Sequence, residues 1–278
     1  MDSAPHGLMP PGCPDELPLK EQFERDGYVA PIRVMSEGQA ADICGRLAAH
    51  QEVHGTLSKA HMNNPHLLFR WADDVIREPE ITDRISEIYG EDLLVWGTTL
   101  FIKQAHHPGF VSWHQDSTYW GLEPADVVTA WVALSDSHAD NGALCVVPGS
   151  HKLDQIEHRD TFSADNMLSR GQEIAVEVDP ADAVCLELQP GEMSLHHVRM
   201  IHGSGPNLSS RKRIGFAIRY IPTRVRQKGG LRDTATLARG TDKFGNFDPE
   251  RSPEADFQPD AVAFHASVEE RLRQIIMQ

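Results

Sequence analysis

Two residues in the stretch WHQDSTYW, residues 113–120, have the types and spacing to bind one metal ion: His114 and Asp116. Successive side chains of a β-strand point to opposite faces, so residues two apart share a face and can hold the same ion. The chain contains two more His-x-Asp triplets, His138-Ala-Asp140 and His158-Arg-Asp160. Because such a triplet is short, its spacing alone does not identify the site.

The surroundings of the three triplets distinguish them. His138-Ala-Asp140 lies in SDSHADNGAL, which has the composition of a turn, and His158-Arg-Asp160 lies in the charged run DQIEHRDTFSAD. Only His114-Gln-Asp116 follows an apolar, strand-like run, FVSW, and precedes aromatic residues. Apolar walls of this kind give the dry, shaped pocket that metal chemistry favours. The sequence therefore predicts the metal site at His114 and Asp116.

A third ligand has to come from elsewhere in the chain, and His202 in RMIHGSGPN is the candidate. The glycines behind it allow the backbone to approach a bound group closely. Two histidines and one carboxylate are the set that binds Fe(II) and leaves positions open for O2 and a co-substrate, whereas zinc is less natural because the chain has no HExxH motif. His196 and His197 compete with His202, but neither precedes Gly-Ser. His196 is interpreted as a pocket residue or, equally, as a satisfied core histidine.

The run RKRIGFAIRY places Arg213 at the start of a strand. Apolar residues alternate along it, so Arg213, Gly215, Ala217 and Arg219 share the other face. A buried arginine needs an anion, and its planar fork matches a carboxylate with two parallel hydrogen bonds. Arg213 therefore predicts a dicarboxylate that chelates the metal at one end, and Ser204 could donate a hydrogen bond to its far carboxylate.

Further residues are candidates for contacting the substrate. Tyr119 and Trp120 follow the ligand pair and form either a pocket wall or ordinary core. His196 is a third candidate, as a pocket residue. Arg219 would meet a second anionic group on the substrate, or else make an internal salt bridge.

The elements that position these residues are helices followed by a β-rich core. Residues 1–16 are rich in Pro and Gly and are predicted to be a flexible tail. The front, residues 17–90, shows helical periodicity and a capping box at Ser36-Glu-Gly-Gln39. Residues 92–222 hold short runs rich in β-branched and aromatic residues, separated by turn residues. They indicate an antiparallel jelly-roll core covered by the N-terminal helices.

The last part of the chain differs in composition from the β-rich core. Residues 223–264 are polar and broken by Gly and Pro, which is typical of a lid or a binding loop. A C-terminal helix is expected at 265–278. Residues 17–278 are therefore predicted to form a single, mainly β domain with flanking helices (α+β), in which a double-stranded β-helix carries the site.

Composition restricts the partners. The 278 residues include 41 Asp and Glu against 26 Lys and Arg, a formal charge of −15, so a small molecule is favoured over nucleic acid. No run reaches the roughly 18 apolar residues that cross a bilayer, and no secretion signal is evident, so a soluble protein without a membrane partner is expected. Cys145 and Cys185 lie in apolar runs, where reduced thiols behave as small hydrophobes, and a reducing cytoplasm fits them.

Three stretches resemble the Fe(II)- and 2-oxoglutarate-dependent oxygenases of the phytanoyl-CoA dioxygenase superfamily. They are WHQD at 113–116, VVTAWVALSDSHADNGALCVVPGSH at 127–151 and HGSGPNLSSRKR at 202–213. The likeness runs through roughly residues 20–222, with the motifs in the same order. It implies a double-stranded β-helix fold, which agrees with the strand pattern.

The resemblance also implies roles for individual residues. His114, Asp116 and His202 would bind iron, and Arg213 and Ser204 would hold 2-oxoglutarate. By the same resemblance, Trp131 would stand beside the co-substrate, and Lys103 matches a lysine that is common at its position in the family, where its role varies. Thr99, earlier on the same strand and the same face as Lys103, is a further candidate for the co-substrate site. Halogenating relatives replace the metal carboxylate with a small residue, so an aspartate at this position implies oxygenation, with release of succinate and CO2.

Several functions stay open on the sequence. Hydroxylation of a C–H bond is the first hypothesis, and desaturation, epoxidation or ring formation at the same iron centre is the alternative. A non-oxygenase, cupin-like metal protein is a second class, which the buried Arg213 disfavours. Acyl-CoA, an amino acid, a phosphonate and a secondary metabolite are all possible substrates, although CoA phosphates would favour a more basic groove. The sequence does not indicate an oligomeric state.

Overall fold

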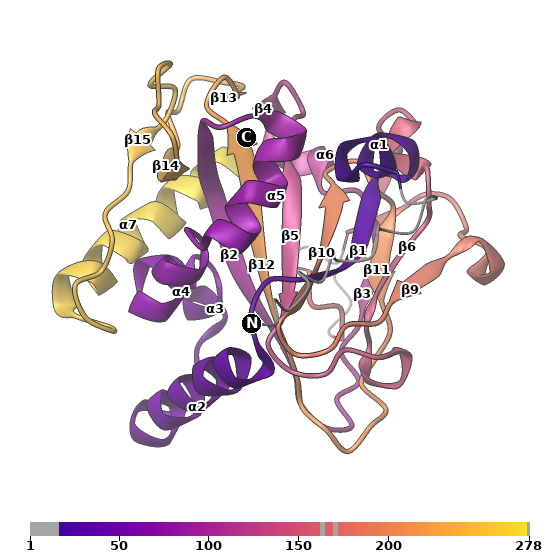
Figure 1. Ribbon diagram of the computed structural model, residues 1–278, viewed down its shortest axis with the longest axis horizontal. Helices are drawn as coiled ribbons and strands as arrows, with labels where there is room; N and C mark the ends of the chain where they lie inside the picture. The colour runs from indigo at the N-terminus through magenta and orange to yellow at the C-terminus, as the bar shows by residue number, and fades with distance from the viewer. Residues whose placement is uncertain (1–16, 162–164, 169–171, 277–278) are drawn as a thin grey trace, which may run out of the picture.

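The computed structural model of the chain describes residues 17–161, 165–168 and 172–276. The tail predicted at 1–16 lies outside the described residues. A seven-stranded sheet and a four-stranded sheet form the core (Figure 1). None of the described helices has both the length and the apolar character needed to span a bilayer.

The large sheet has the strand order β1-β10-β5-β12-β2-β14-β15, and the small sheet has the order β3-β11-β6-β9. Neighbouring strands are antiparallel except β14 and β15. One cavity is lined by side chains from both sheets, which therefore face each other as in a jelly roll. The predicted fold class, mainly β with flanking helices, is confirmed. The strands are β1 (Tyr28–Arg33), β2 (Leu93–Lys103), β3 (Val111–His114), β5 (Val128–Ala133), β6 (Leu144–Val146), β9 (Val184–Leu186), β10 (Glu192–His197), β11 (His202–Ser204), β12 (Arg213–Pro222), β14 (Thr234–Arg239) and β15 (Asp248–Pro249).

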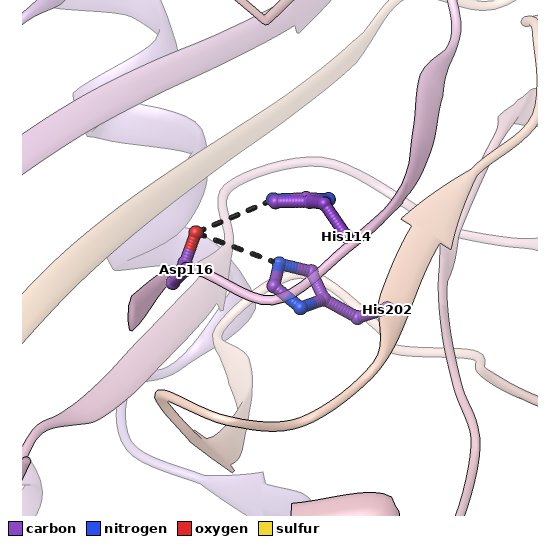
Figure 2. A group of neighbouring side chains, drawn as sticks. All are labelled: His114, Asp116 and His202. Atoms are coloured by element: carbon purple, nitrogen blue, oxygen red, sulfur yellow. Dashed lines mark ion pairs between the residues drawn. The ribbon is translucent and has the colours of Figure 1, made fainter. Parts of the chain in front are cut away.

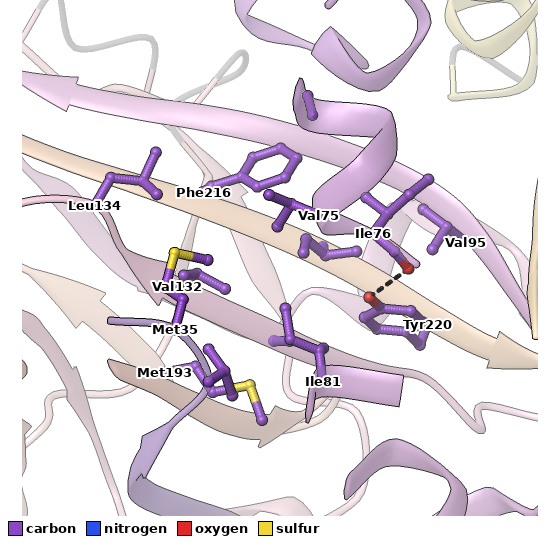
Figure 3. Close-up of a cluster of buried hydrophobic side chains, with 14 of the residues drawn as sticks. Met35, Val75, Ile76, Ile81, Val95, Val132, Leu134, Met193, Phe216 and Tyr220 are labelled. Atoms are coloured by element: carbon purple, nitrogen blue, oxygen red, sulfur yellow. Dashed lines mark hydrogen bonds between the residues drawn. The ribbon is translucent and has the colours of Figure 1, made fainter. Parts of the chain in front are cut away.

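The helices cover the outer face of the large sheet. On β12 the apolar residues Ile214, Phe216, Ile218 and Tyr220 pack into the main hydrophobic cluster on that face. The hydroxyl of Tyr220 donates a hydrogen bond to the backbone oxygen of Ile76 at 2.9 Å (Figure 3). The alternation predicted for β12 is thus observed, and the opposite face of the strand is left for the cavity.

The helices begin and end where the sequence signals predict. The side chains of Ser36 and Gln39 form the expected capping box at the start of α2. Helix α5 buries Ile81 and Ile85 against the sheet and ends at a glycine. The helices are α1 (Leu19–Asp26), α2 (Glu37–His54), α3 (Lys59–Met62), α4 (Arg70–Val75), α5 (Pro79–Tyr89), α6 (Ser117–Trp120) and α7 (Pro259–Ile276), with short 3-10 turns at Pro65–Leu67, Ala139–Asn141, Ser150–Lys152 and Pro180–Asp182.

The sequence predicted a helical front, but the structure also has a strand in this part of the chain. Strand β1 lies between α1 and α2 and pairs with β10 at the edge of the large sheet. Its sequence, YVAPIR, contains a proline, which is tolerated at a sheet edge but weakens the strand signal.

The segment 223–264 has more regular structure than its polar composition suggests. Strand β14 pairs with β2 in the large sheet, and α7 begins at Pro259, earlier than the predicted 265. The prediction missed β14 because its buried face is polar. Thr234 and Thr236 are buried, and their hydroxyls donate hydrogen bonds to the carboxylate of Glu250. A short strand, β13 (Arg226–Gln227), pairs with β4 (Leu122–Glu123), directly after α6.

Cys145 and Cys185 form a disulfide bond, so the prediction of two reduced thiols is wrong for this structure. The two residues are direct partners across the antiparallel strands β6 and β9. A cross-strand register of this kind cannot be seen in the sequence, because 40 residues separate the two cysteines. Cys44 is a free thiol.

Candidate active site

The three predicted metal ligands lie together. Strands β3 and β11 are antiparallel neighbours in which His202 lies opposite His114, and Asp116 follows two residues after the end of β3. Oδ1 of Asp116 is 3.3 Å from Nε2 of His114 and 3.9 Å from Nε2 of His202 (Figure 2). The three ligand atoms lie within 4.8 Å of one another, and no other such group occurs among the described residues.

Backbone carbonyls orient both imidazole rings. Nδ1 of His114 lies 2.9 Å from the oxygen of Ser112, and Nδ1 of His202 lies 2.9 Å from the oxygen of Met200. Because a carbonyl only accepts, each Nδ1 must carry the proton. In this orientation Nε2 of each ring faces Asp116, which is the arrangement that metal-binding histidines adopt.

The charges suit a divalent metal. Burial by itself would raise the pKa of Asp116, but the neighbouring His202 and His114 outweigh it and hold the pKa below its ordinary value. Burial, reinforced by His114, lowers the pKa of His202 well below its ordinary value. Two imidazoles whose Nε2 atoms face one ionised carboxylate fit the donor set of a facial Fe(II) site.

The predicted co-substrate residues form a cationic end of the same cavity. Arg213 on β12 lies opposite Lys103 on β2, and both side chains are buried. Nζ of Lys103 donates to Oγ of Ser204 at 2.7 Å and also to the oxygen of Gly205. Nη1 of Arg213 donates to the oxygen of Gly142 at 2.6 Å, while its Nε has no partner among the described residues.

The buried side chains of Lys103 and Arg213 require an anion nearby. Burial, with a contribution from Arg213, lowers the pKa of Lys103 to about 7. Neither Lys103 nor Arg213 forms an ion pair with a carboxylate of the described residues. Two buried cations side by side are unfavourable unless a negative charge is bound, so a carboxylate of a small ligand fits this end.

Trp131, which the resemblance places beside the co-substrate, lies next to Arg213 in the cavity wall. Its ring centroid lies 5.2 Å from Cζ of Arg213. The indole covers Gly215 so closely that a Cβ atom there would be 1.9 Å from Cζ2 of Trp131. Only glycine fits at this position of β12, because any side chain would push the indole out of place.

The remaining predicted residues have mixed outcomes. His196 and Arg219 line the cavity, and Trp120 packs under Arg219 with its ring centroid 5.2 Å from Cζ. Thr99 accepts a hydrogen bond from Nη1 of Arg219 at 2.8 Å and lies opposite Ala217, so the structure does not bring it to Arg213. The side chain of Tyr119 is outside the described part of the structure.

Two of the alternatives weighed from the sequence do not hold. Arg219 makes no salt bridge within the described residues, and the ring of His196 is not satisfied, because its Nδ1 has no hydrogen-bond partner there. Burial lowers the pKa of His196 to about 4. Thr129, which the sequence reasoning missed, also lines the cavity. The alternation in VVTAWVA could have revealed it, since Thr129 shares a face with Trp131.

Comparison with known proteins shows the family to which the chain belongs. Residues 23–215 match the family model described as phytanoyl-CoA dioxygenase (PhyH). The chain belongs to the phytanoyl-CoA dioxygenase family. The match includes all three candidate metal ligands and Arg213 of this PhyH-family protein.

The chain is similar to individual proteins that are named as alpha-ketoglutarate-dependent or hydroxylating enzymes. It is 32% identical over 161 residues to a probable alpha-ketoglutarate-dependent hypophosphite dioxygenase of Stutzerimonas stutzeri, covering 57% of this chain and 56% of that protein. It is 27% identical to the L-proline trans-4-hydroxylase of Streptomyces griseoviridis, covering 73% and 85% of the two chains. The chain spans about half the length of the first curated relatives that it matches.

A solved structure is similar over nearly the whole chain. The non-heme monooxygenase ThoJ, in its apo form, has a TM-score of 0.82 and 38% identity, covering 94% of this chain and 98% of that one. The structure of CytC3 with Fe(II) and alpha-ketoglutarate has a TM-score of 0.63 at 24% identity, covers 86% of this chain and 93% of that one, and supports the fold.

Proposed function

We propose that this PhyH-family protein is a non-haem Fe(II)- and 2-oxoglutarate-dependent dioxygenase that hydroxylates a C–H bond of a small molecule and releases succinate and CO2. The observation that carries the proposal is one cavity that is lined both by His114, Asp116 and His202 and by the buried Arg213. Ser204 lines the same cavity and is held by the buried Lys103. A metal site alone would suit many functions. The cationic end, at a distance from the metal ligands, suits the far carboxylate of 2-oxoglutarate.

The residues of the chain have distinct tasks in this proposal. His114, Asp116 and His202 would hold Fe(II), which activates O2 with electrons from 2-oxoglutarate when both are bound. Arg213 and Ser204 would orient the co-substrate through its far carboxylate, and Lys103 would hold the hydroxyl of Ser204 in place. Trp131, Phe101 and Leu144 line the cavity and exclude water, which limits side reactions.

The test of this function is release of succinate. Purified protein with Fe(II), ascorbate and 2-oxoglutarate should release succinate, even without substrate, and Arg213→Ala should require far more 2-oxoglutarate. A folded, iron-loaded protein that neither binds 2-oxoglutarate nor releases succinate would instead support a cupin-like metal protein. Once a substrate is known, product analysis separates hydroxylation from desaturation, epoxidation or ring formation.

We propose a small molecule as the substrate, in keeping with relatives named for hypophosphite and L-proline. We also propose a cytoplasmic location, although the disulfide between Cys145 and Cys185 removes the thiol argument for it. We also propose that the segment 223–264 is a lid over the cavity. Its strand β13 pairs with β4, and β4 follows helix α6, which begins directly after Asp116.

A further inference from the structure

Three polar residues form a row across the floor of the cavity. His196 on β10 lies opposite Thr129 on β5, and Thr129 lies opposite Arg219 on β12. All three side chains line the cavity. Arg219, the member of the row on β12, is six residues from Arg213, which corresponds to about 20 Å at the rise of a strand. The row is therefore separate from the co-substrate end.

Each residue of the row has a buried polar atom without a partner among the described residues: Nδ1 of His196, Oγ1 of Thr129 and Nε of Arg219. The side chains of His196 and Thr129 are each only 2% exposed. An unpaired buried polar atom destabilises the folded chain, and three side by side are uncommon in a protein interior. A bound polar group would satisfy all three at once.

The position of Arg219 is fixed before any ligand binds. Its Nη1 donates to Oγ1 of Thr99 at 2.8 Å, and its guanidinium lies over the ring of Trp120. These contacts leave Nε facing the cavity with no hydrogen bond. The row also borders the metal ligands, since the ring centroids of His196 and His202 are 4.8 Å apart.

The charges of the cavity favour a single negative charge at this row. With Fe(II) and 2-oxoglutarate bound as proposed above, Asp116 and the chelating carboxylate balance the two charges of the metal. Arg213 balances the far carboxylate. Arg219, whose Nε is buried, then has no carboxylate of its own: no described carboxylate forms an ion pair with it, and Asp116, whose charge acts on it at longer range, also faces the metal.

We infer that Arg219, Thr129 and His196 form a substrate subsite that binds an oxyanion group, a carboxylate or a phosphonate, and thereby presents a neighbouring C–H bond of a small acidic substrate to the metal. The inference rests on the proposed function and names the substrate class. Arg219 supplies the charge, and the hydroxyl of Thr129 and the imidazole of His196 supply hydrogen bonds. They are specificity-determining residues, distinct from those that hold the co-substrate.

The experiment uses calorimetric titration of the anaerobic protein with Fe(II). 2-Oxoglutarate is titrated first, and its failure to bind would contradict the proposed function rather than the subsite. Acetate, methylphosphonate and neutral acetamide are then titrated into the 2-oxoglutarate-loaded protein. For ligands this small, a dissociation constant of about 1 mM is expected for an anion, and acetamide should bind much more weakly. The better of the two anions identifies the oxyanion class.

Variants locate the anion. Arg219→Gln should weaken anion binding about 10- to 100-fold, the loss expected for one charge-assisted hydrogen bond, without changing 2-oxoglutarate affinity. Thr129→Val should weaken it about threefold to tenfold while leaving the unfolding midpoint unchanged or higher, because the hydroxyl that it removes has no partner. Arg224→Gln, which changes an exposed arginine paired with Asp126, is the matched control and should bind as the wild type does.

Two results would overturn the subsite. The first is that neither anion binds to the 2-oxoglutarate-loaded protein; if an anion then binds only to the protein without 2-oxoglutarate, it binds at Arg213. The second is that an anion binds equally well to Arg219→Gln, as it would if it were attached to the metal.

Discussion

Replacing Gly215 by alanine should displace Trp131 and damage the co-substrate end of the cavity. A Cβ atom at this position would lie 1.9 Å from Cζ2 of the indole, about 1.5–2 Å closer than carbon atoms normally approach. Trp131 is 4% exposed and rigid, so the methyl group cannot be accommodated by a small side-chain rotation. Overpacking of this kind costs about 1–3 kcal/mol of unfolding free energy. The displaced indole would also lose its contact with Arg213 and weaken 2-oxoglutarate binding.

The matched control makes the same chemical change where there is room. Gly45 is an exposed residue inside helix α2, and a Cβ atom there meets nothing within 4 Å. Gly45→Ala should therefore stabilise the protein by about 0.5–1 kcal/mol and leave 2-oxoglutarate affinity unchanged. Denaturant unfolding measures the first quantity, and titration with 2-oxoglutarate the second. If Gly215→Ala were as stable as the wild type and bound 2-oxoglutarate equally well, the packing of Trp131 on β12 would be described wrongly.

Four further predictions concern other parts of the molecule. Asp116→Ala should abolish stoichiometric Fe(II) binding, measured by metal analysis after dialysis, and normal metal content would contradict the ligand set. Arg213→Ala should raise the dissociation constant of 2-oxoglutarate more than about 30-fold in calorimetry, with Arg213→Lys between it and the wild type. Burial lowers the pKa of Lys103 to about 7 from its ordinary value of 10.5, so the unfolded chain binds more protons between these pH values. The unfolding free energy of the wild type should therefore rise with pH through this window relative to that of Lys103→Met, and parallel curves would refute the shift. Reducing the disulfide, which joins residues 40 apart, should lower the unfolding free energy by about 3–4 kcal/mol in denaturation with and without reductant.

The sequence predicts the parts of this protein that rest on local pattern. The capping box at Ser36 and Gln39, the alternation on β12 and the candidate metal ligands His114, Asp116 and His202 could all be predicted from residue types and spacing. In each case the signal lies within a few residues, or in a motif whose order resembles that of a known family.

What the sequence could not predict depends on register between distant strands. The disulfide needs Cys145 opposite Cys185, and the polar row needs Thr129 between His196 and Arg219. No local pattern fixes such pairings, because a shift of one residue would turn each side chain to the other face. Thr99 illustrates the same limit. It was predicted at the co-substrate end from its strand and face, but its register opposite Ala217 brings it to Arg219 instead.

Two buried polar clusters in this protein show why partnering, rather than burial, indicates a binding site. Outside the cavity, His66 and Glu250 are buried, yet both ring nitrogens of His66 and both oxygens of Glu250 have hydrogen-bond partners. That cluster links β2, β14 and the 3-10 turn at Pro65–Leu67, and it needs no ligand. In the cavity, Oγ1 of the buried Thr129 and Nε of the partly buried Arg219 are removed from water but have no partner among the described residues. A folded chain can satisfy such groups internally, as it does at Glu250. The unpaired atoms of Thr129 and Arg219 beside the candidate metal site are therefore best explained by a ligand that forms hydrogen bonds with them.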